Sequence, residues 1–281
     1  MLAPYALGLV ALVFLPALAA VVLAGFDYDF LRPPRFVGLG NLSELLHDVV
    51  FRISLRNTLV FVLLAVPLRL LGALGLALLL HPRTSGVGGY RTATFLPTVI
   101  PDVAYALVWI WILNPLYGPV NLIISALGLP EPAWFTAGGA AQSAIVIMAV
   151  FQIGEGFLIA LATRQAIPGD LYDMARVEGA GDGYMWWRVT LPLMAPTLAL
   201  LAFRDTVLMF QINFVPALLV TKGGPPLYST TYLSLFAYRE GFEYLRHGYA
   251  AAATLAMFFV TALIVYLQWR IVQRWRHAMV V

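Results

Sequence analysis

The sequence predicts an all-α integral membrane protein with six transmembrane helices and one long polar loop between the fourth and the fifth. Of its 281 residues, 61% are hydrophobic and 11% are charged, whereas soluble domains carry about 25% charged residues. Six apolar stretches are long enough to cross a bilayer, which takes about 20 residues. Because no stretch has the composition of a soluble domain, residues 1–281 are expected to form one membrane domain.

The expected spans follow the hydrophobic runs in order. They cover residues 2–26, 57–80, 92–113, 141–162, 195–220 and 249–272. The first begins directly after Met1, without a basic segment or a cleavage site, so we expect a retained helix and not a signal peptide. The third contains Pro97 and Pro101, which membrane helices tolerate as kinks when neighbouring helices pack against them.

Two of the connections on the opposite side from the long polar loop have the signals of ordered structure. Residues 36–46 predict a turn that enters a short helix, capped by Asn41 or Ser43. Residues 114–121 are dense in turn-forming residues, and residues 120–127 predict a helix that lies along the membrane surface.

The distribution of basic residues sets the expected orientation, because cytoplasmic loops are enriched in them. Loops 81–91 and 163–190 and the C-terminal tail carry eight arginines, against seven basic residues in the three longer connections on the other side. This small excess places both termini and the loop 163–192 in the cytoplasm.

Several classes of function are not supported by the sequence. There is no cysteine, which excludes disulfides and thiol chemistry. No P-loop and no His-Glu-x-x-His motif occurs, so neither bound ATP, a metal nor a catalytic residue is expected in this chain. The basic residues are scattered, so no nucleic-acid partner is expected. Gly179–Asp182 matches the signature of intramembrane aspartyl proteases, but such enzymes need a second, facing aspartate inside the membrane.

The segment 163–192 is polar and punctuated by glycines. A proline and an aspartate at 168–170 favour the start of a helix, and apolar residues recur at helical spacing up to residue 178. Three glycines within 179–183 permit a sharp turn at small cost. Residues 184–190 predict a second short helix. From these residues alone, an ordinary connecting loop and a knob that docks onto a partner are equally supported.

This segment resembles the EAA loop of bacterial ABC import permeases, in which a short helix docks into the ATPase subunit. Here the motif reads Asp173-Met174-Ala175, then Glu178-Gly179-Ala180, and closes at Val189-Thr190-Leu191-Pro192. The two acids keep the charges of the family pattern, and Met174 replaces a small alanine. The resemblance implies contact with the ATPase through Asp173, Ala175, Glu178, Gly179, Ala180, Gly181 and Asp182.

A wider resemblance, to permeases of the maltose and glycerol-phosphate type, covers nearly the whole chain. The matching segments are 95–101, 116–121, 221–225, 238–242 and 248–252. The Gly-Gly-Pro loop at 223–225 resembles the first of the two permease subunits of such systems, and the Gly-rich tail of the other type is not found here. Val215 departs from the pattern, because an aspartate often follows the phenylalanine aligned with Phe214.

The resemblance implies the fold of a type I ABC importer permease and a non-catalytic role in translocation. The implied partners are a second, homologous permease subunit, two ATPase subunits that carry ATP and Mg²⁺, and an extracellular or lipid-anchored solute-binding protein. The expected substrate is a carbohydrate, and the expected location is the bacterial cytoplasmic membrane. Three alternatives stay open: a non-sugar solute such as a polyamine or a phosphate ester, a self-sufficient secondary transporter, and a structural scaffold.

Three ionisable residues lie inside the expected spans: Arg69, Glu155 and Arg204, the last with Asp205 beside it. Such residues are costly in a bilayer and are functional hypotheses by default. At a rise of about 1.5 Å per residue, each lies about 12–16 Å from the cytoplasmic end of its helix. We therefore expect a salt-bridged cluster, which either holds the helices together or gates the inner half of the pathway.

Three neutral polar residues, Gln152, Gln211 and Asn213, are expected nearer the middle and outer half of the membrane. They have aromatic neighbours, and amide groups beside aromatic rings suit a sugar, whose hydroxyls need hydrogen-bond partners. The alternative role for each is a hydrogen bond between helices.

Overall fold

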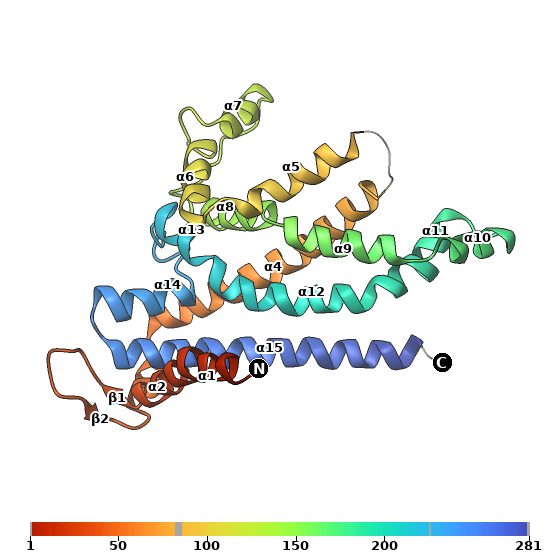
Figure 1. Cartoon of the computed structure of the whole chain (residues 1–281). Coiled ribbons are helices and arrows are strands. Elements are labelled where there is room, and N and C mark those ends of the chain that lie inside the picture. Colours follow the sequence, from red (N-terminus) through yellow and green to blue (C-terminus); the bar gives the residue numbers. More distant parts are fainter. Residues whose placement is uncertain (1, 82–85, 225, 280–281) are drawn as a thin grey trace.

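The computed structural model describes residues 2–81, 86–224 and 226–279, with side chains up to residue 274. Two of the eight arginines counted above, Arg83 and the side chain of Arg276, therefore lie outside the described residues, as does Pro225 of the Gly-Gly-Pro loop. Long helices run side by side between two ends of the molecule (Figure 1). We call the end with α10 the inner end and the end with β1, β2 and α14 the outer end.

The chain begins with an apolar helix that leads to a small hairpin. Its parts are α1 (Ala3–Leu9), the π-helix η1 (Val10–Phe14) and α2 (Leu15–Leu23). β1 (Phe26–Asp27) then pairs antiparallel with β2 (Arg35–Phe36). None of the described residues of this first helix is buried in the chain, so its apolar surface is left for lipid or a partner.

Asn41 has a different role from the one that the sequence predicted. α3 (Gly40–His47) begins after Leu39 and has no side-chain cap, so the prediction of Asn41 or Ser43 as its cap was wrong. The Asn41 side chain instead donates to the carbonyls of Ala24 and Phe26, at 2.9 and 2.8 Å. It thereby fastens α3 to the segment that follows α2.

The second span is longer than predicted. α4 (Val49–Leu79) begins eight residues before residue 57, because Asp48 caps it. The Asp48 carboxylate accepts hydrogen bonds from the backbone N–H groups of Val50 and Phe51, at 2.7 and 3.1 Å. These bonds satisfy two of the donors that every helix start leaves free.

The third expected span is not one helix. α5 (Val87–Val99) and α6 (Asp102–Ile112) meet at an angle of 107°, so the segment predicted as a span over 92–113 is a bent pair of helices that begins at residue 87. Proline disfavours the helical conformation of the residue before it, and Ile100 before Pro101 is extended, with ψ of 128°. The prediction of a helix near 120–127 is confirmed by α7 (Pro119–Ala126).

The fourth span is also broken, with no proline at the break. α8 (Gly138–Phe151) and α9 (Gly154–Ala166) differ in direction by 43°. α9 then leads into α10 (Gly169–Val177), which lies at the inner end of the molecule.

The predicted second short helix at 184–190 is instead the start of the fifth span. α11 (Asp182–Met185), the π-helix η2 (Trp186–Thr190) and α12 (Leu191–Ile212) form one continuous helix. Pro192 lies at the start of α12, directly after the π-helix η2. The wider turn of a π-helix leaves room for the proline ring, and the hydrogen bond that proline cannot donate is not needed there.

The last third of the chain returns to the outer end and then crosses once more. α13 (Phe214–Leu219) follows α12, and α14 (Leu233–Tyr238) and the π-helix η3 (Arg239–Glu243) form the outer end. α15 (His247–Met279) then runs the length of the molecule from the outer end towards the inner end (Figure 1).

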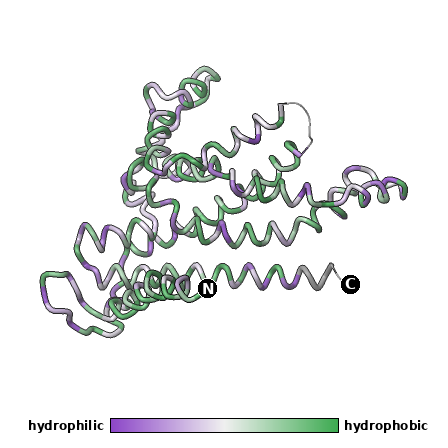
Figure 2. Tube along the Cα trace, in the orientation of Figure 1, coloured by the Kyte–Doolittle hydropathy of each residue, from purple (hydrophilic) through white to green (hydrophobic). Residues whose placement is uncertain are grey.

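Among the described residues, four helices are long and apolar enough to cross a membrane, or up to six if each bent pair counts as one span. Hydrophobic residues predominate along the long helices, and hydrophilic residues gather near α10 and in the hairpin (Figure 2). This is the distribution expected for helices surrounded by lipid and ends that face water.

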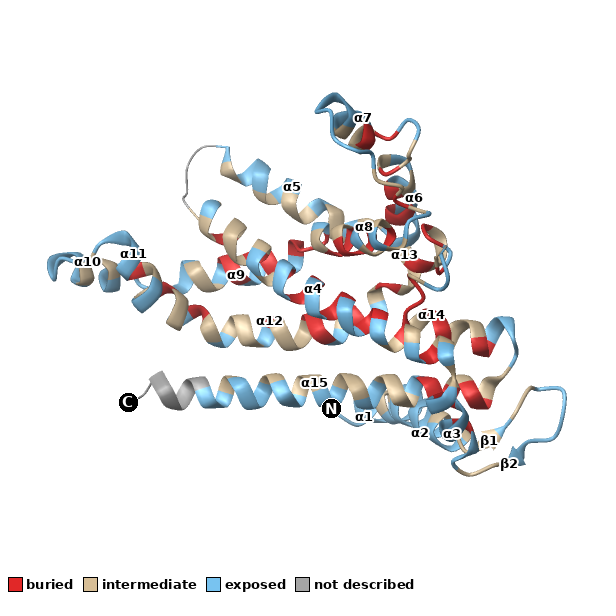
Figure 3. Ribbon diagram, turned by 180° about the vertical axis from the view of Figure 1, so that it is seen from behind, coloured by how far each residue is buried: buried red, intermediate tan, exposed pale blue. Residues whose placement is uncertain are grey.

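Buried residues gather where α4, α8 and α12 meet (Figure 3), but they form two separate apolar clusters. The larger, which we call the outer core, includes Phe61, Val66, Met148, Phe210 and Leu235. The smaller, the inner core, consists of Ala73, Ala77, Phe157, Ala160, Leu161, Met194 and Leu201, from α4, α9 and α12.

Candidate functional site

α10 is an exposed helix at the inner end. Its Asp173 and Arg176 side chains are 73% and 61% exposed and form an ion pair at 3.1 Å. Two apolar side chains, Met174 and Val177, are also exposed. Apolar side chains that project beside charged ones are typical of a surface that a partner covers.

The end of α10 explains why the motif needs glycine at position 179. Gly179 has a φ of 84°, in the left-handed region that glycine adopts at little cost. Its N–H donates to the carbonyl of Arg176 and that of Ala180 donates to Ala175, both at 2.9 Å. This is the Schellman arrangement, which stops a helix and reverses the chain.

The other two glycines of the motif do not turn the chain in the same way. Gly181 is extended, with a φ of −76° and ψ of 164°, and precedes α11. Gly183 lies inside α11. The prediction that all three glycines form the turn was therefore wrong, because one left-handed residue at the helix end suffices.

Tyr172 connects α10 to the helices on either side of it. The hydroxyls of Tyr172 and Thr190 lie 2.8 Å apart, and the Arg164 guanidinium lies over the Tyr172 ring, 4.6 Å from its centre. Thr190 is buried at the start of the fifth span. The sequence analysis missed this linkage, because no local pattern relates residues 164, 172 and 190.

The residues predicted to contact an ATPase all lie in this one segment. Asp173 and Ala175 belong to α10, Glu178 to Ala180 form its end, and Gly181 and Asp182 begin α11. Ala175 and Ala180 are half-buried and the others are exposed. Their contact with an ATPase stays a prediction.

The ionisable residues inside the spans form a continuous chain of ion pairs, which we call the inner network: Arg69, Asp205, Arg204 and Glu155. The Arg69 Nε lies 3.0 Å from Asp205 Oδ2, and both side chains are 4% exposed. Arg204 pairs with Glu155 and lies 3.4 Å from the other Asp205 oxygen. Asp205, which the sequence analysis placed only beside Arg204, is thus the residue that joins the two arginines.

The inner network lies at the break between α8 and α9. A helix end leaves carbonyls without partners, and here side chains from other helices satisfy two of them. The Tyr105 hydroxyl donates to Met148 O at 2.7 Å, and the Arg69 guanidinium donates to Ala149 O. The charges also suit the helix dipoles. The guanidinium of Arg69, from α4, lies at the C-terminal end of α8, and Glu155 is in the first turn of α9.

The backbone at the break is tightly packed. A methyl group on Gly154 would lie 2.9 Å from Phe95 Cα and 3.1 Å from the carbonyl oxygen of Thr94, in α5. One on Gly72, in α4, would lie 3.1 Å from Ile153 Cδ1. Glycine therefore lets α9 begin in close contact with two neighbouring helices.

Two of the three predicted substrate residues line one small cavity. Gln152, at the break, and Asn213, between α12 and α13, border a space of about 10 Å³, which is near the size of one water. Ser234 donates to Asn213 Oδ1 at 2.7 Å, and Asn213 Nδ2 has no hydrogen-bond partner among the described residues. Gln211 does not join them and is exposed on α12.

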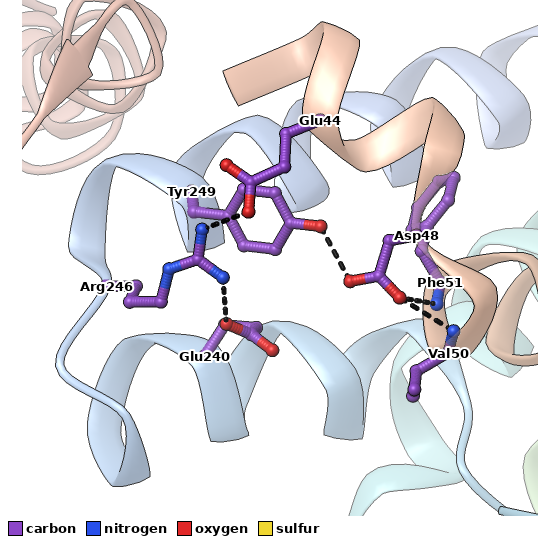
Figure 4. Close-up of polar contacts among 7 residues, drawn as sticks. All are labelled: Glu44, Asp48, Val50, Phe51, Glu240, Arg246 and Tyr249. Atoms are coloured by element: carbon purple, nitrogen blue, oxygen red, sulfur yellow. Dashed lines mark hydrogen bonds and ion pairs between the residues drawn. The ribbon is translucent and has the colours of Figure 1, made fainter. Parts of the chain in front are cut away.

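A second charged group, which we call the outer cluster, lies at the outer end (Figure 4). It comprises Glu44, Asp48, Glu240, Arg246 and Tyr249. Arg246 pairs with Glu44 at 2.5 Å and with Glu240 at 3.4 Å. The Tyr249 hydroxyl donates to Asp48 at 2.8 Å.

The outer cluster joins distant parts of the chain beside a cavity of about 440 Å³, bordered by Glu44, Arg246 and Tyr249. Arg246 is 42% exposed and Glu240 is 10% exposed. Burial raises the pKa of Glu240 above its ordinary value, and Arg246 partly offsets this rise. The sequence analysis missed this group, because its residues come from two segments, 44–48 and 240–249, and Asp48 and Tyr249 are 201 residues apart.

Within the described residues, no three His, Asp or Glu side chains gather in the way that a metal ion needs.

The chain matches the model of the binding-protein-dependent transport system inner membrane component family over residues 88–277. The likeness to individual proteins extends beyond this range to nearly the whole chain.

Two curated relatives come from Agrobacterium fabrum (strain C58). The sulfoquinovosyl glycerol transport system permease protein is 29% identical, over 97% of this chain and 89% of the relative. The sn-glycerol-3-phosphate transport system permease protein is 30% identical, over 99% of this chain and 94% of the relative. Among solved structures, a chain of a bacterial ABC transporter for the import of alginate matches with a TM-score of 0.84 and 24% identity, over 98% of this chain and 94% of that one.

Proposed function

The chain belongs to the family of inner membrane components of binding-protein-dependent transport systems, and from this premise we propose that it is the permease subunit of an ABC importer for a carbohydrate. The importer draws its energy from ATP on separate subunits. The permease itself makes and breaks no covalent bond. It provides a path through the membrane that opens to one side at a time.

The nature of the substrate is supported by the relatives. The names of two relatives refer to a glycosyl glycerol and to glycerol phosphate, both of which present several oxygen atoms that accept or donate hydrogen bonds. The amides of Gln152 and Asn213 offer matching groups near the middle of the chain's helices. The runner-up is a phosphate ester, for which the second relative is the direct precedent; a polyamine has no such support.

We propose three kinds of partner: a second, homologous permease subunit, two ATPase subunits and an extracellular or lipid-anchored binding protein. α10 faces the cytoplasm and docks into an ATPase subunit, which places both termini on the same side of the membrane. The binding protein delivers the substrate at the outer end. When ATP closes the ATPase pair, α10 moves and carries that motion into the membrane helices.

One observation carries this proposal: α10 is exposed yet firmly connected to two membrane helices. Tyr172 contacts Arg164 at the end of α9 and Thr190 at the start of the fifth span. A loop that only connected two spans would need neither the exposed apolar residues nor this connection. Displacing α10 therefore displaces both helices.

The test is retention of the ATPase by the purified complex and ATP-driven uptake in vesicles. We expect Glu178→Arg, in the docking segment, to reduce ATPase retention at least about tenfold, which corresponds to about 1.4 kcal/mol of binding free energy. Glu131→Arg changes an equally exposed carboxylate in the loop after α7 and is the matched control. Equal retention by both variants would contradict the docking role of α10.

The same preparations separate the alternatives. Uptake by vesicles that hold only this chain, driven by an ion gradient, would establish a secondary transporter. A native chain that retains no ATPase and supports no uptake would establish a scaffold. Hydrolysis stimulated by binding protein loaded with a sugar, sn-glycerol 3-phosphate or a polyamine identifies the class of solute.

A further inference from the structure

We infer that the inner core and α10 move as one body relative to the outer core, and that the inner network is the joint between them. The inference rests on the proposed function, because α10 must be moved by an ATPase for the joint to work. It adds a division of the chain into a moving and a fixed body, and it gives separate roles to the Arg69–Asp205 and Glu155–Arg204 pairs of the inner network.

The first observation is that the buried apolar residues form two cores, with the partly buried Leu70 packed against both. α4 contributes Val66 to the outer core and Ala73 to the inner core. Arg69 lies between these two residues in the same helix, and its ion pair with Asp205 of α12 lies in the layer between the two cores. Closely packed interiors shift as units and do not deform evenly, so a motion is concentrated where two cores meet at a polar layer.

The second observation is the backbone at this level. The fourth span is broken between α8, which belongs to the outer core, and α9, which belongs to the inner core. α4 contains Pro67, two residues before Arg69, and a proline inside a helix removes a hydrogen bond and allows bending. Both helices are thus weakened at the same level as the inner network.

The third observation is the difference in exposure between the Arg69–Asp205 pair and the Glu155–Arg204 pair. Arg69 and Asp205 are 4% exposed, and separating a buried pair of this kind is strongly unfavourable. Glu155 and Arg204 are 50% and 31% exposed on this chain; charged side chains inside membrane spans that neighbouring helices do not enclose face a water-filled cavity, where separating them costs little. The buried pair is therefore the permanent pivot, and the Glu155–Arg204 pair is the part that opens.

The inner body is held together by further contacts. The Thr163 hydroxyl, on α9, donates to the Thr197 hydroxyl on α12 at 3.2 Å, close to the linkage through Tyr172. α9, α10 and the first half of α12 therefore move together. Gln152, at the joint, borders the small cavity with Asn213, so bending there changes the size of the space proposed for the substrate.

The experiment measures distances between spin labels in the complete complex with its ATPase subunits. The chain contains no cysteine, so within this chain labels attach only where cysteines are introduced. Ser143→Cys with Gln165→Cys places exposed labels on α8 and α9, across the joint. Gln165→Cys with Leu200→Cys places both exposed labels on the inner body and is the matched control.

The distances are compared with and without a non-hydrolysable ATP analogue. α9 has 13 residues, a length of about 20 Å, so a bend of about 15° moves its far end by about 5 Å. We expect a change of about this size across the joint and less than about 2 Å in the control. Equal changes in both pairs, or none in either, would overturn the inference if the labelled complex hydrolyses ATP and imports substrate. A complex that does neither contradicts the proposed function instead.

A variant tests the pair that opens. Glu155→Gln is expected to shift the distance across the joint towards its nucleotide-bound value without nucleotide, and to raise basal ATP hydrolysis about fivefold or more. Glu243→Gln, whose side chain is 44% exposed and pairs with Arg239 at 3.6 Å, is the control and changes neither.

Two results would overturn the role of this pair. In the first, Glu155→Gln behaves like the Glu243 control. In the second, Glu155→Gln does not assemble, because a pair that opens in every cycle is not required for assembly. The joint itself is still decided by the label distances in the chain that retains Glu155.

Discussion

The inner network and the outer cluster use the same kinds of side chain, but only the inner network contains an ion pair that the chain encloses on both sides. Each centres on an arginine with two acidic neighbours: Arg204 in the inner network and Arg246 in the outer cluster. The inner network adds a second arginine, and the pair of Arg69 with Asp205 is 4% exposed on both sides. In the outer cluster, Arg246 and Glu44 are 42% and 55% exposed.

The difference shows that ion pairs of similar geometry have unlike consequences in one chain. Separating a pair that water cannot reach leaves an uncompensated charge, which is strongly unfavourable. Separating an exposed pair costs about 0–1 kcal/mol, because water replaces the partner. We therefore expect the buried Arg69–Asp205 pair to determine whether the helices assemble, and the outer cluster to adjust the position of the outer end.

The largest expected effect comes from Asp205→Asn. It leaves the buried Arg69 without a counter-charge, which typically costs about 3–5 kcal/mol. We expect a large loss of assembled protein and a lower melting temperature in detergent. Glu44→Gln, the matched change in the outer cluster, is expected to cost less than about 1 kcal/mol. Similar melting temperatures for the two variants would break the comparison.

Gly154→Ala is next in size and tests the packing around the inner network. Its methyl group would lie 2.9 Å from Phe95 Cα, and a backbone atom gives way less easily than a flexible side chain. Overpacking of this kind costs about 1–3 kcal/mol. Gly139→Ala, in α8, meets no atom within 4 Å and is the control. Unfolding in denaturant compares the two, and an equal midpoint would show that α9 can move away from α5.

Two tyrosines provide a sharper comparison of buried and accessible hydrogen bonds. Tyr105→Phe leaves the carbonyl of Met148 without its hydroxyl donor in the buried break, at an expected cost of about 1–3 kcal/mol. Tyr249→Phe removes a donor from Asp48, which still accepts two backbone N–H groups, so we expect about 0.5–1.5 kcal/mol. Thermal unfolding of both variants should rank Tyr105→Phe as the more harmful, and the opposite order would contradict the comparison.

The smallest effect is a dependence on pH in the outer cluster. Burial raises the pKa of Glu240 above its ordinary value of 4.5, so the folded state holds this proton more tightly than the unfolded state. The stabilisation from this group is complete below pH 4.5 and is lost as the pH rises through the folded-state pKa. Acidification in this window therefore favours the folded chain.

The comparison of wild type with Glu240→Gln isolates this contribution, because Glu44 and Asp48 titrate in both proteins. We expect the melting temperature of the wild type to rise more between pH 7 and pH 5 than that of the variant. An equal change in both would show that Glu240 does not carry the effect.

Features that depend on neighbouring residues could be predicted from the sequence. The apolar runs identify the helices, although the bend of 107° at Pro101 exceeds the kink that its prolines indicated. Likewise, the end of α10 follows from Gly179, because a Schellman turn involves only adjacent residues. The roles predicted for the docking residues and for Gln211 stay predictions.

Features that depend on contacts between distant residues could not be predicted in this way. Arg69 and Asp205 are 136 residues apart in the chain, and nothing local to either residue selects the other. No proline marks the break before Gly154 in the sequence. The break depends instead on Tyr105 and Arg69, whose side chains donate hydrogen bonds to the carbonyls of Met148 and Ala149. The outer cluster likewise depends on how α3, η3 and α15 meet.

The sequence by itself determined that this chain crosses a membrane several times and carries an EAA-type segment, because hydrophobic length and motif spacing are properties of consecutive residues. Only the tertiary structure decided where the helices break, which charges pair and that the apolar residues form two cores. The physical reason is that lipid imposes the same requirement on every span, whereas a buried charge or a free carbonyl is satisfied only by the particular side chain that the fold brings to it.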